Sequence, residues 1–168
     1  MKRLTVGVLF LIIVSFTLAA CHLVEEGDDP VINLHFSASD LEDEEYESIG
    51  TAGLESPTKA DFKNIEFTLE VKHSDEITNR QILMPEVKQA ANSYDEERYW
   101  FGRSYRQDNP QENFAQYGYS FVLYTHGLDE QGIRDIFKAK DVKISWVDED
   151  DVYEEQVFDL GDILQFEE

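Results

Sequence analysis

The stretch Ile65-Glu66-Phe67-Thr68-Leu69-Glu70-Val71-Lys72 alternates apolar and polar residues without a break. Successive side chains of an extended chain point to opposite sides, so this period of two predicts a strand with one buried face and one solvated face. Residues 117–125 and 142–146 repeat the pattern, and the apolar residues on both faces of 117–125 favour a central strand. The alternation predicts a fold built mainly from β-strands.

Weaker signals complete the expected elements. The additional strand candidates are residues 77–84, 99–105, 152–158 and 163–166. Pro85 can open one short helix, and helical spacing over 129–139, capped by Asp129, predicts another. Strands outnumber helices and the connections are short, which favours an immunoglobulin-like antiparallel β-sandwich over residues 62–168. The alternative is an α+β domain whose helix at 129–139 packs on one antiparallel sheet.

The composition is strongly acidic. The chain of 168 residues has 36 acidic and 14 basic residues, a formal net charge of −22. Nucleic-acid binding is driven by Lys and Arg that neutralise phosphates, so this charge argues against a nucleic-acid partner. It also repels the protein body from an anionic membrane surface.

Residues 22–61 differ in composition from the segment that follows. They contain twelve acidic residues and one basic residue, Lys59, and they are interrupted by glycines and prolines. Low hydrophobicity combined with high net charge predicts a mostly disordered tether over 21–61. Only Val31–Phe36 has some apolar density, and it could form a short docking strand.

The first residues have the layout of a secretory signal peptide. Lys2 and Arg3 precede an apolar run, Leu4–Ala20, which ends in small residues. The motif Leu18-Ala19-Ala20-Cys21 resembles the lipobox of bacterial lipoproteins. That resemblance implies a cleaved signal peptide over 1–20 and a diacylglycerol on Cys21, which would anchor the protein in the cell membrane on its extracytoplasmic side.

Cys21 is also the single cysteine of the chain. A lone cysteine in a secreted protein would leave a free thiol or pair with another molecule, and lipidation removes that problem. The alternatives are an uncleaved signal anchor or free secretion. As a whole, the chain resembles the small uncharacterised lipoproteins of Gram-positive bacteria.

No signature of catalysis is present in the sequence. A nucleophile needs an adjacent base, and the only cysteine is the expected lipid site. None of the common hydrolase, zinc-protease or nucleotide-binding motifs occurs, and the four histidines lack metal-ligand spacing. We therefore expect a non-enzymatic binding or interaction module of the cell envelope without a cofactor. The alternative function is a secreted hydrolase, or a calcium-dependent binding protein that uses acidic residues.

Calcium is the metal to consider, because it prefers oxygen ligands. Asp148, Asp150 and Asp151 are weak candidate ligands in a predicted hairpin loop between two strands. The loop fails the pattern of an EF-hand, since Tyr153 stands where the glycine is required. A solvated hairpin turn explains the same residues.

Aromatic and arginine residues are interleaved from Tyr94 onward. Because Trp, Tyr and Arg often dominate interfaces, the candidate residues for binding a protein or a cell-wall polymer are Arg98, Trp100, Arg103 and Tyr105. If Tyr99, Phe101 and Tyr105 face the core, Trp100 is exposed. The alternative is that all of these aromatic residues are core and that the arginines pair with carboxylates.

The lipobox resemblance generates the first test. We expect Cys21→Ala to release the protein from membranes, because stable anchoring takes about two hydrophobic chains and the variant has none. Fractionation of cells into membrane and non-membrane parts measures this, with Ser15→Ala as the matched control. A Cys21→Ala protein that stays uncut and membrane-bound would contradict the lipoprotein assignment.

Overall fold

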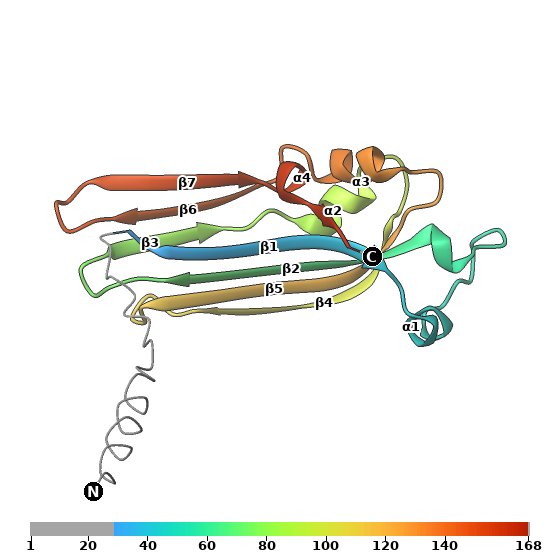
Figure 1. Cartoon of the computed structure of the whole chain (residues 1–168), viewed down its shortest axis with the longest axis horizontal. Helices are drawn as coiled ribbons and strands as arrows, with labels where there is room; N and C mark the ends of the chain where they lie inside the picture. Colours follow the sequence, from blue (N-terminus) through green and yellow to red (C-terminus); the bar gives the residue numbers. More distant parts are fainter. Residues whose placement is uncertain (1–28, 168) are drawn as a thin grey trace, which may run out of the picture.

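The computed structural model describes residues 29–167, so the predicted signal peptide and Cys21 lie outside the described residues. Two β-sheets pack face to face and form an elongated sandwich (Figure 1). Between residues 29 and 167, no helix combines the length and the apolar character needed to cross a membrane.

Sheet A has the strand order β4-β5-β2-β1-β8, and sheet B has the order β3-β6-β7. The bounds are β1 Val31–Asp40, β2 Phe62–Lys72, β3 Thr78–Leu83, β4 Tyr99–Asp108, β5 Phe114–Tyr124, β6 Asp141–Val147, β7 Tyr153–Asp159 and β8 Gln165–Phe166. Neighbours are antiparallel, except that the short β8 pairs in parallel with β1. The orders β4-β5-β2-β1 and β3-β6-β7 are those of a constant-type immunoglobulin sandwich, so the predicted fold class is confirmed.

The alternating stretch forms β2, near the middle of sheet A. Its inward side chains are all buried: Ile65, Phe67, Leu69 and Val71. Phe67 lies opposite Phe36 of β1 and opposite Tyr119 of β5, so one apolar face extends across three strands. This face packs against the buried side chains of β6 and closes the core between the two sheets.

The position of β1 contradicts the prediction that the folded domain begins at residue 62. It pairs with β2 along its full length, from Val31 opposite Lys72 to Asp40 opposite Lys63. The prediction of a mostly disordered tether over 21–61 is therefore wrong for residues 31–61. The average composition of the segment concealed a strand whose inward residue Phe36 is fully buried.

Helices fill the connections between the strands. They are α1 Asp43–Ser48, the 3₁₀ helix η1 Lys59–Asp61, α2 Val87–Asn92, α3 Glu130–Phe137 and α4 Leu160–Ile163. Asp129 caps α3 as predicted, accepting a hydrogen bond from the N–H of Gly132 at 2.8 Å. Gly161 lies in α4, where a side-chain carbon would come within 2.7 Å of the Arg134 carbonyl oxygen.

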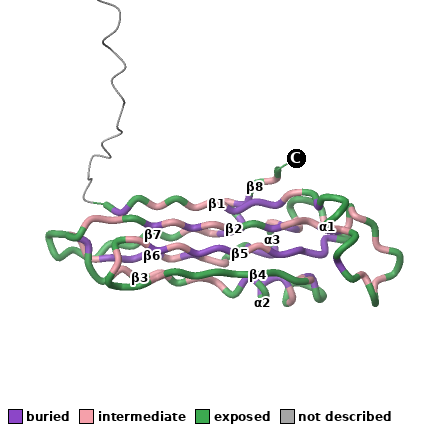
Figure 2. The backbone as a smooth tube through the Cα atoms, turned by 90° about the horizontal axis from the view of Figure 1, so that it is seen from below, coloured by how far each residue is buried: buried purple, intermediate pink, exposed green. Residues whose placement is uncertain are grey.

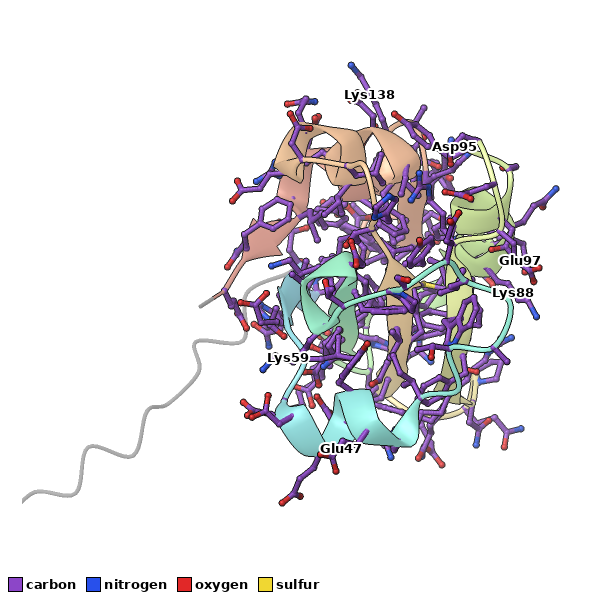
Figure 3. All side chains as sticks on the ribbon, turned by 90° about the vertical axis from the view of Figure 1, so that its right-hand side faces the viewer. Glu47, Lys59, Lys88, Asp95, Glu97 and Lys138 are labelled. Atoms are coloured by element: carbon purple, nitrogen blue, oxygen red, sulfur yellow. The ribbon has the colours of Figure 1, made fainter. Side chains whose placement is uncertain are left out.

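A second, smaller apolar cluster lies on the outer face of sheet A, the face that points away from sheet B. Its buried members are Leu41, Ile49, Phe62, Val122 and Tyr124. The connection that contains α1 covers this cluster at one end of the sandwich. Figure 3 looks onto that end and shows α1, marked by Glu47, across the sheets from α3, which is followed by Lys138. No other segment of residues 29–167 covers the rest of the outer face.

The position of β1 generates a stability test. Phe36→Ala should lower the free energy of unfolding by about 3–5 kcal/mol, because it leaves a cavity where the ring contacts Phe67 and Phe137. Denaturant unfolding of the full chain measures the change. Val31→Ala is the matched control, since this strand residue is 46% exposed. Equal stability of the Phe36→Ala protein and the wild type would mean that β1 is a dispensable docking strand.

Candidate functional site

A β-bulge near the start of β4 decides which aromatic side chains are exposed. Tyr99 and Phe101 pair with consecutive residues of β5, so Trp100 is the extra residue. An extra residue shifts the alternation of side chains by one position from that point onward. Tyr99 consequently faces the core, whereas Phe101 and Tyr105 are 51% and 58% exposed.

The predicted faces of this strand are therefore wrong for Phe101, Tyr105 and Trp100. The Trp100 ring packs against the outer-face cluster, with its centroid 6.1 Å from that of Phe62. Its Nε1–H donates a hydrogen bond to the carbonyl oxygen of Gly50 at 2.6 Å. Trp100 thus fixes the α1 connection to the sheet and is not the exposed aromatic residue of the strand.

Arg98, predicted as a binding residue, is internal and only 2% exposed. Its Nε and Nη2 donate to the two carboxylate oxygens of Asp95 at 2.5 and 2.6 Å, and Nη2 also lies 3.3 Å from Glu96. Its Nη1 donates to the carbonyl oxygens of Tyr124 and His126. The hydrogen bonds of Arg98 hold the pKa of Asp95 below its ordinary value. Arg98 ties the α2–β4 connection to the end of β5.

Arg103 is placed differently, on the exposed part of β4. It makes no hydrogen bond or ion pair with any of residues 29–167, whereas Arg106 pairs with Asp108 at 3.3 Å. Phe101, Arg103 and Tyr105 lie on the outer side of this edge strand, and we call these three residues the aromatic strip. Figure 2 shows β4 as a largely exposed strand along the side of the sandwich.

A hollow of about 490 Å³ lies on the open outer face beside Tyr105. Its lining comes from β1, β2, β4 and β5: Ile32, Asn33, Leu34, His35, Thr68, Leu69, Glu70, Tyr105 and Gln116. The Tyr105 ring rests on Gly118, because a side-chain carbon on that glycine would lie 2.0 Å from Cε1 of the ring. The glycine lets the ring lie against the sheet while more than half of the side chain remains exposed.

Polar side chains of three strands form a row across the floor of this hollow. Gln116 donates from Nε2 to Oε1 of Glu70 at 3.1 Å, and Lys72 contacts Oε2 of the same carboxylate at 3.1 Å. The hydrogen bonds of Lys72 and Gln116 hold the pKa of Glu70 below its ordinary value. Asn33 lies opposite Glu70 in the pairing of β1 with β2, and Thr68 is the next outward residue of β2. We call Asn33, Thr68, Glu70 and Gln116 the polar row.

A second hollow of about 300 Å³ lies farther along the same face, toward α1. Phe101 and Arg103 line one side of it, and Glu45 and Ser48 of the α1 segment line the other. The aromatic strip therefore borders both hollows on this face of sheet A.

A third hollow, of about 380 Å³, opens between the sheets at the β3–β4 side and is lined in part by Tyr117 and Tyr119. Arg80, which sequence reasoning missed, joins the sheets beside it. Its side chain is 4% exposed and donates to Asp108 at 2.9 Å. The Tyr117 hydroxyl donates to the same carboxylate at 2.5 Å. The contact between Arg80 and His73 Nε2, at 2.7 Å, extends this network, which cross-links β3 to the β4–β5 hairpin.

The predicted calcium loop is a hairpin turn. The Asp148 carboxylate accepts hydrogen bonds from the backbone N–H groups of Asp150 and Val152, so it holds the turn together. Across residues 29–167, no group of three or more His, Cys, Asp or Glu side chains is arranged to hold a metal ion. The hairpin turn therefore gives a structural explanation for the acidic residues of this loop, Asp148, Asp150 and Asp151.

Sequence reasoning found only part of the outer face. It selected Arg103 and Tyr105, which lie there, together with Arg98 and Trp100, which have structural roles. It missed the polar row, whose members come from separate strands and have ordinary spacing in the chain. One available signal was Gly118, since a glycine within a strand often marks the close approach of another group.

Comparison of the chain with protein-family models, with curated proteins and with solved structures gives no match.

The two arginines generate a matched pair of tests. Arg98→Ala should lower the free energy of unfolding by about 1–3 kcal/mol, because it leaves the carbonyl groups of Tyr124 and His126 without their hydrogen-bond donor. Arg103→Ala should leave the unfolding midpoint unchanged, since Arg103 has no partner within residues 29–167. Thermal unfolding by circular dichroism compares the two variants with the wild type. Similar midpoints for both variants would show that the Arg98 network is not structural.

Proposed function

We propose that this protein is a lipid-anchored, extracytoplasmic lipoprotein whose sandwich domain is a non-enzymatic binding module of the cell envelope. The observation that carries the binding role is the aromatic strip, which borders two hollows on the open face of sheet A. Exposed aromatic and arginine side chains are the residue types that most often dominate interfaces. The anchor rests on the lipobox resemblance at Cys21.

The position of β1 limits how far the domain stands from the proposed anchor. Nine residues separate Cys21 from Val31, where β1 begins. The ten residue steps from Cys21 to Val31 span about 35 Å at most when fully extended. The domain therefore sits close to the membrane, where its reach suits a partner at the membrane surface or a polymer of the adjoining wall.

The carboxyl groups with shifted pKa values suit the role of hydrogen-bond acceptor and not that of general acid. In the described part of the chain, every carboxyl group with a clear shift has a lowered pKa: Asp40, Asp43, Asp61, Glu70, Asp95 and Asp108. At Asp108, burial acts against ionisation and is outweighed by the hydrogen bonds of Tyr117 and Arg80. A general acid near neutral pH needs a raised pKa instead, and these carboxylates remain charged acceptors.

Site-specific cross-linking in intact cells tests the binding role. Benzoylphenylalanine in place of Phe101 should give an adduct of higher mass on illumination, because the benzophenone inserts into C–H bonds of a bound protein or polymer. The same substitution at Tyr153, which is 63% exposed on sheet B, is the matched control and should give none.

Adding Arg103→Ala to the Phe101 substitution should reduce the adduct several-fold, because the variant removes the cation of the strip, which has no partner among residues 29–167. Adducts of equal yield from both positions, or from neither, would contradict a binding role for the aromatic strip.

A further inference from the structure

We propose that the hollow beside Tyr105 binds an uncharged glycan chain, with one sugar ring against Tyr105 and its hydroxyl groups on the polar row. The inference rests on the proposed binding function and names its ligand class. It concerns the hollow of about 490 Å³ that β1, β2, β4 and β5 line on the outer face of sheet A.

Tyr105 supplies a flat apolar platform. The ring lies against Gly118, and the side chain is nevertheless 58% exposed, so the face turned away from the sheet is available to a ligand. The negative face of an aromatic ring attracts weakly positive hydrogen atoms. A pyranose ring presents such C–H groups on one side, and it can therefore stack on this platform.

The polar row supplies the complementary hydrogen bonds. Glu70 is an acceptor, Gln116 and Asn33 each carry both a donor and an acceptor group, and the Thr68 hydroxyl can do either. Gln116 donates to Glu70 at 3.1 Å, so these two groups are already paired before a ligand arrives. Sugar hydroxyl groups both donate and accept, so a hydroxyl-rich ligand matches a mixed row better than an apolar peptide does.

The charge of the chain favours an uncharged glycan over an acidic one. A formal net charge of −22 repels a polyanion, and Glu70 stands within the hollow itself. Arg103 lines the second hollow and has no hydrogen-bond or ion-pair partner among residues 29–167, and in this arrangement it donates hydrogen bonds to hydroxyl or carbonyl oxygens of the glycan chain.

The strip also sets the size of the ligand. Phe101 and Tyr105 are four residues apart on one strand, so their Cα atoms are separated by about 13 Å. Both rings are exposed on the same face, one at each hollow. A chain of several sugars can contact both rings, whereas a monosaccharide reaches only one.

Calorimetric titration of the full chain with uncharged hexasaccharides tests the inference. The probes are cellohexaose, chitohexaose and mannohexaose, with polygalacturonate as the acidic comparison. The protein is kept in a detergent without a sugar headgroup, because an alkyl glycoside would compete for the hollow. At least one uncharged hexasaccharide should bind with a Kd below about 1 mM.

Variants then locate the binding. Tyr105→Ala should weaken it by about tenfold or more, whereas Tyr105→Phe keeps the ring and should retain it. Gln116→Ala should also weaken the binding of the hexasaccharide. This second variant keeps the inference testable if Tyr105→Ala does not fold. Tyr153→Ala, an exposed tyrosine on sheet B, is the matched control and should bind as the wild type does.

Three results would overturn the inference: no binding of any uncharged hexasaccharide, stronger binding of polygalacturonate, or equal binding by the wild type and Tyr105→Ala. The cross-linking at Phe101 distinguishes this failure from failure of the binding role. If the adduct at Phe101 contains only protein and no glycan binds, the proposed binding role stands and the proposal of a glycan ligand fails.

Discussion

β2 pairs with a neighbour along its whole length on both sides, and the rest of the structure depends on that double pairing. β1 and β5 each place apolar side chains level with Ile65, Phe67, Leu69 and Val71. Because side chains alternate along a strand, the same register that builds the core on one face also aligns the polar side chains on the other. The polar row is thus a consequence of core register, and a slip of one residue would destroy both.

The outer face differs from the core face because only part of it is covered. The connection after β1 returns over the sheet through α1 and buries Phe62, Val122 and Tyr124 at one end. The bulge at Trp100 makes this cover fit, since Trp100 turns outward and bonds to Gly50 of the connection. The same bulge turns Phe101 and Tyr105 outward over the uncovered part. The one inserted residue, Trp100, therefore both holds the α1 connection on the sheet and leaves the aromatic strip exposed.

Period-two patterning predicted most strands, because each strand of a sandwich has to place apolar residues on one side. It was outweighed at β1, where the acidic composition favoured a disordered tether and left Val31–Phe36 only as a short docking strand, although Phe36 and Ala38 are fully buried. It failed at Trp100, because nothing in the local sequence distinguishes a bulge from a regular strand. The role of Arg98 depends on Tyr124 and His126, carbonyl partners 26 and 28 residues away, which no local pattern reveals.

In the proposed anchored state, the same architecture also orients the open face. β1 enters at the end of the sandwich that carries the acidic hairpin around Asp148 (Figure 1). Repulsion between that hairpin and an anionic bilayer acts within about a Debye length, roughly 8 Å at physiological ionic strength, and so keeps this end of the domain from resting on the lipid. An upright domain holds β4 along the membrane normal, with Tyr105 nearer the bilayer and Phe101 farther away. The open face then points sideways, where an extended polymer can pass along it without meeting the lipid.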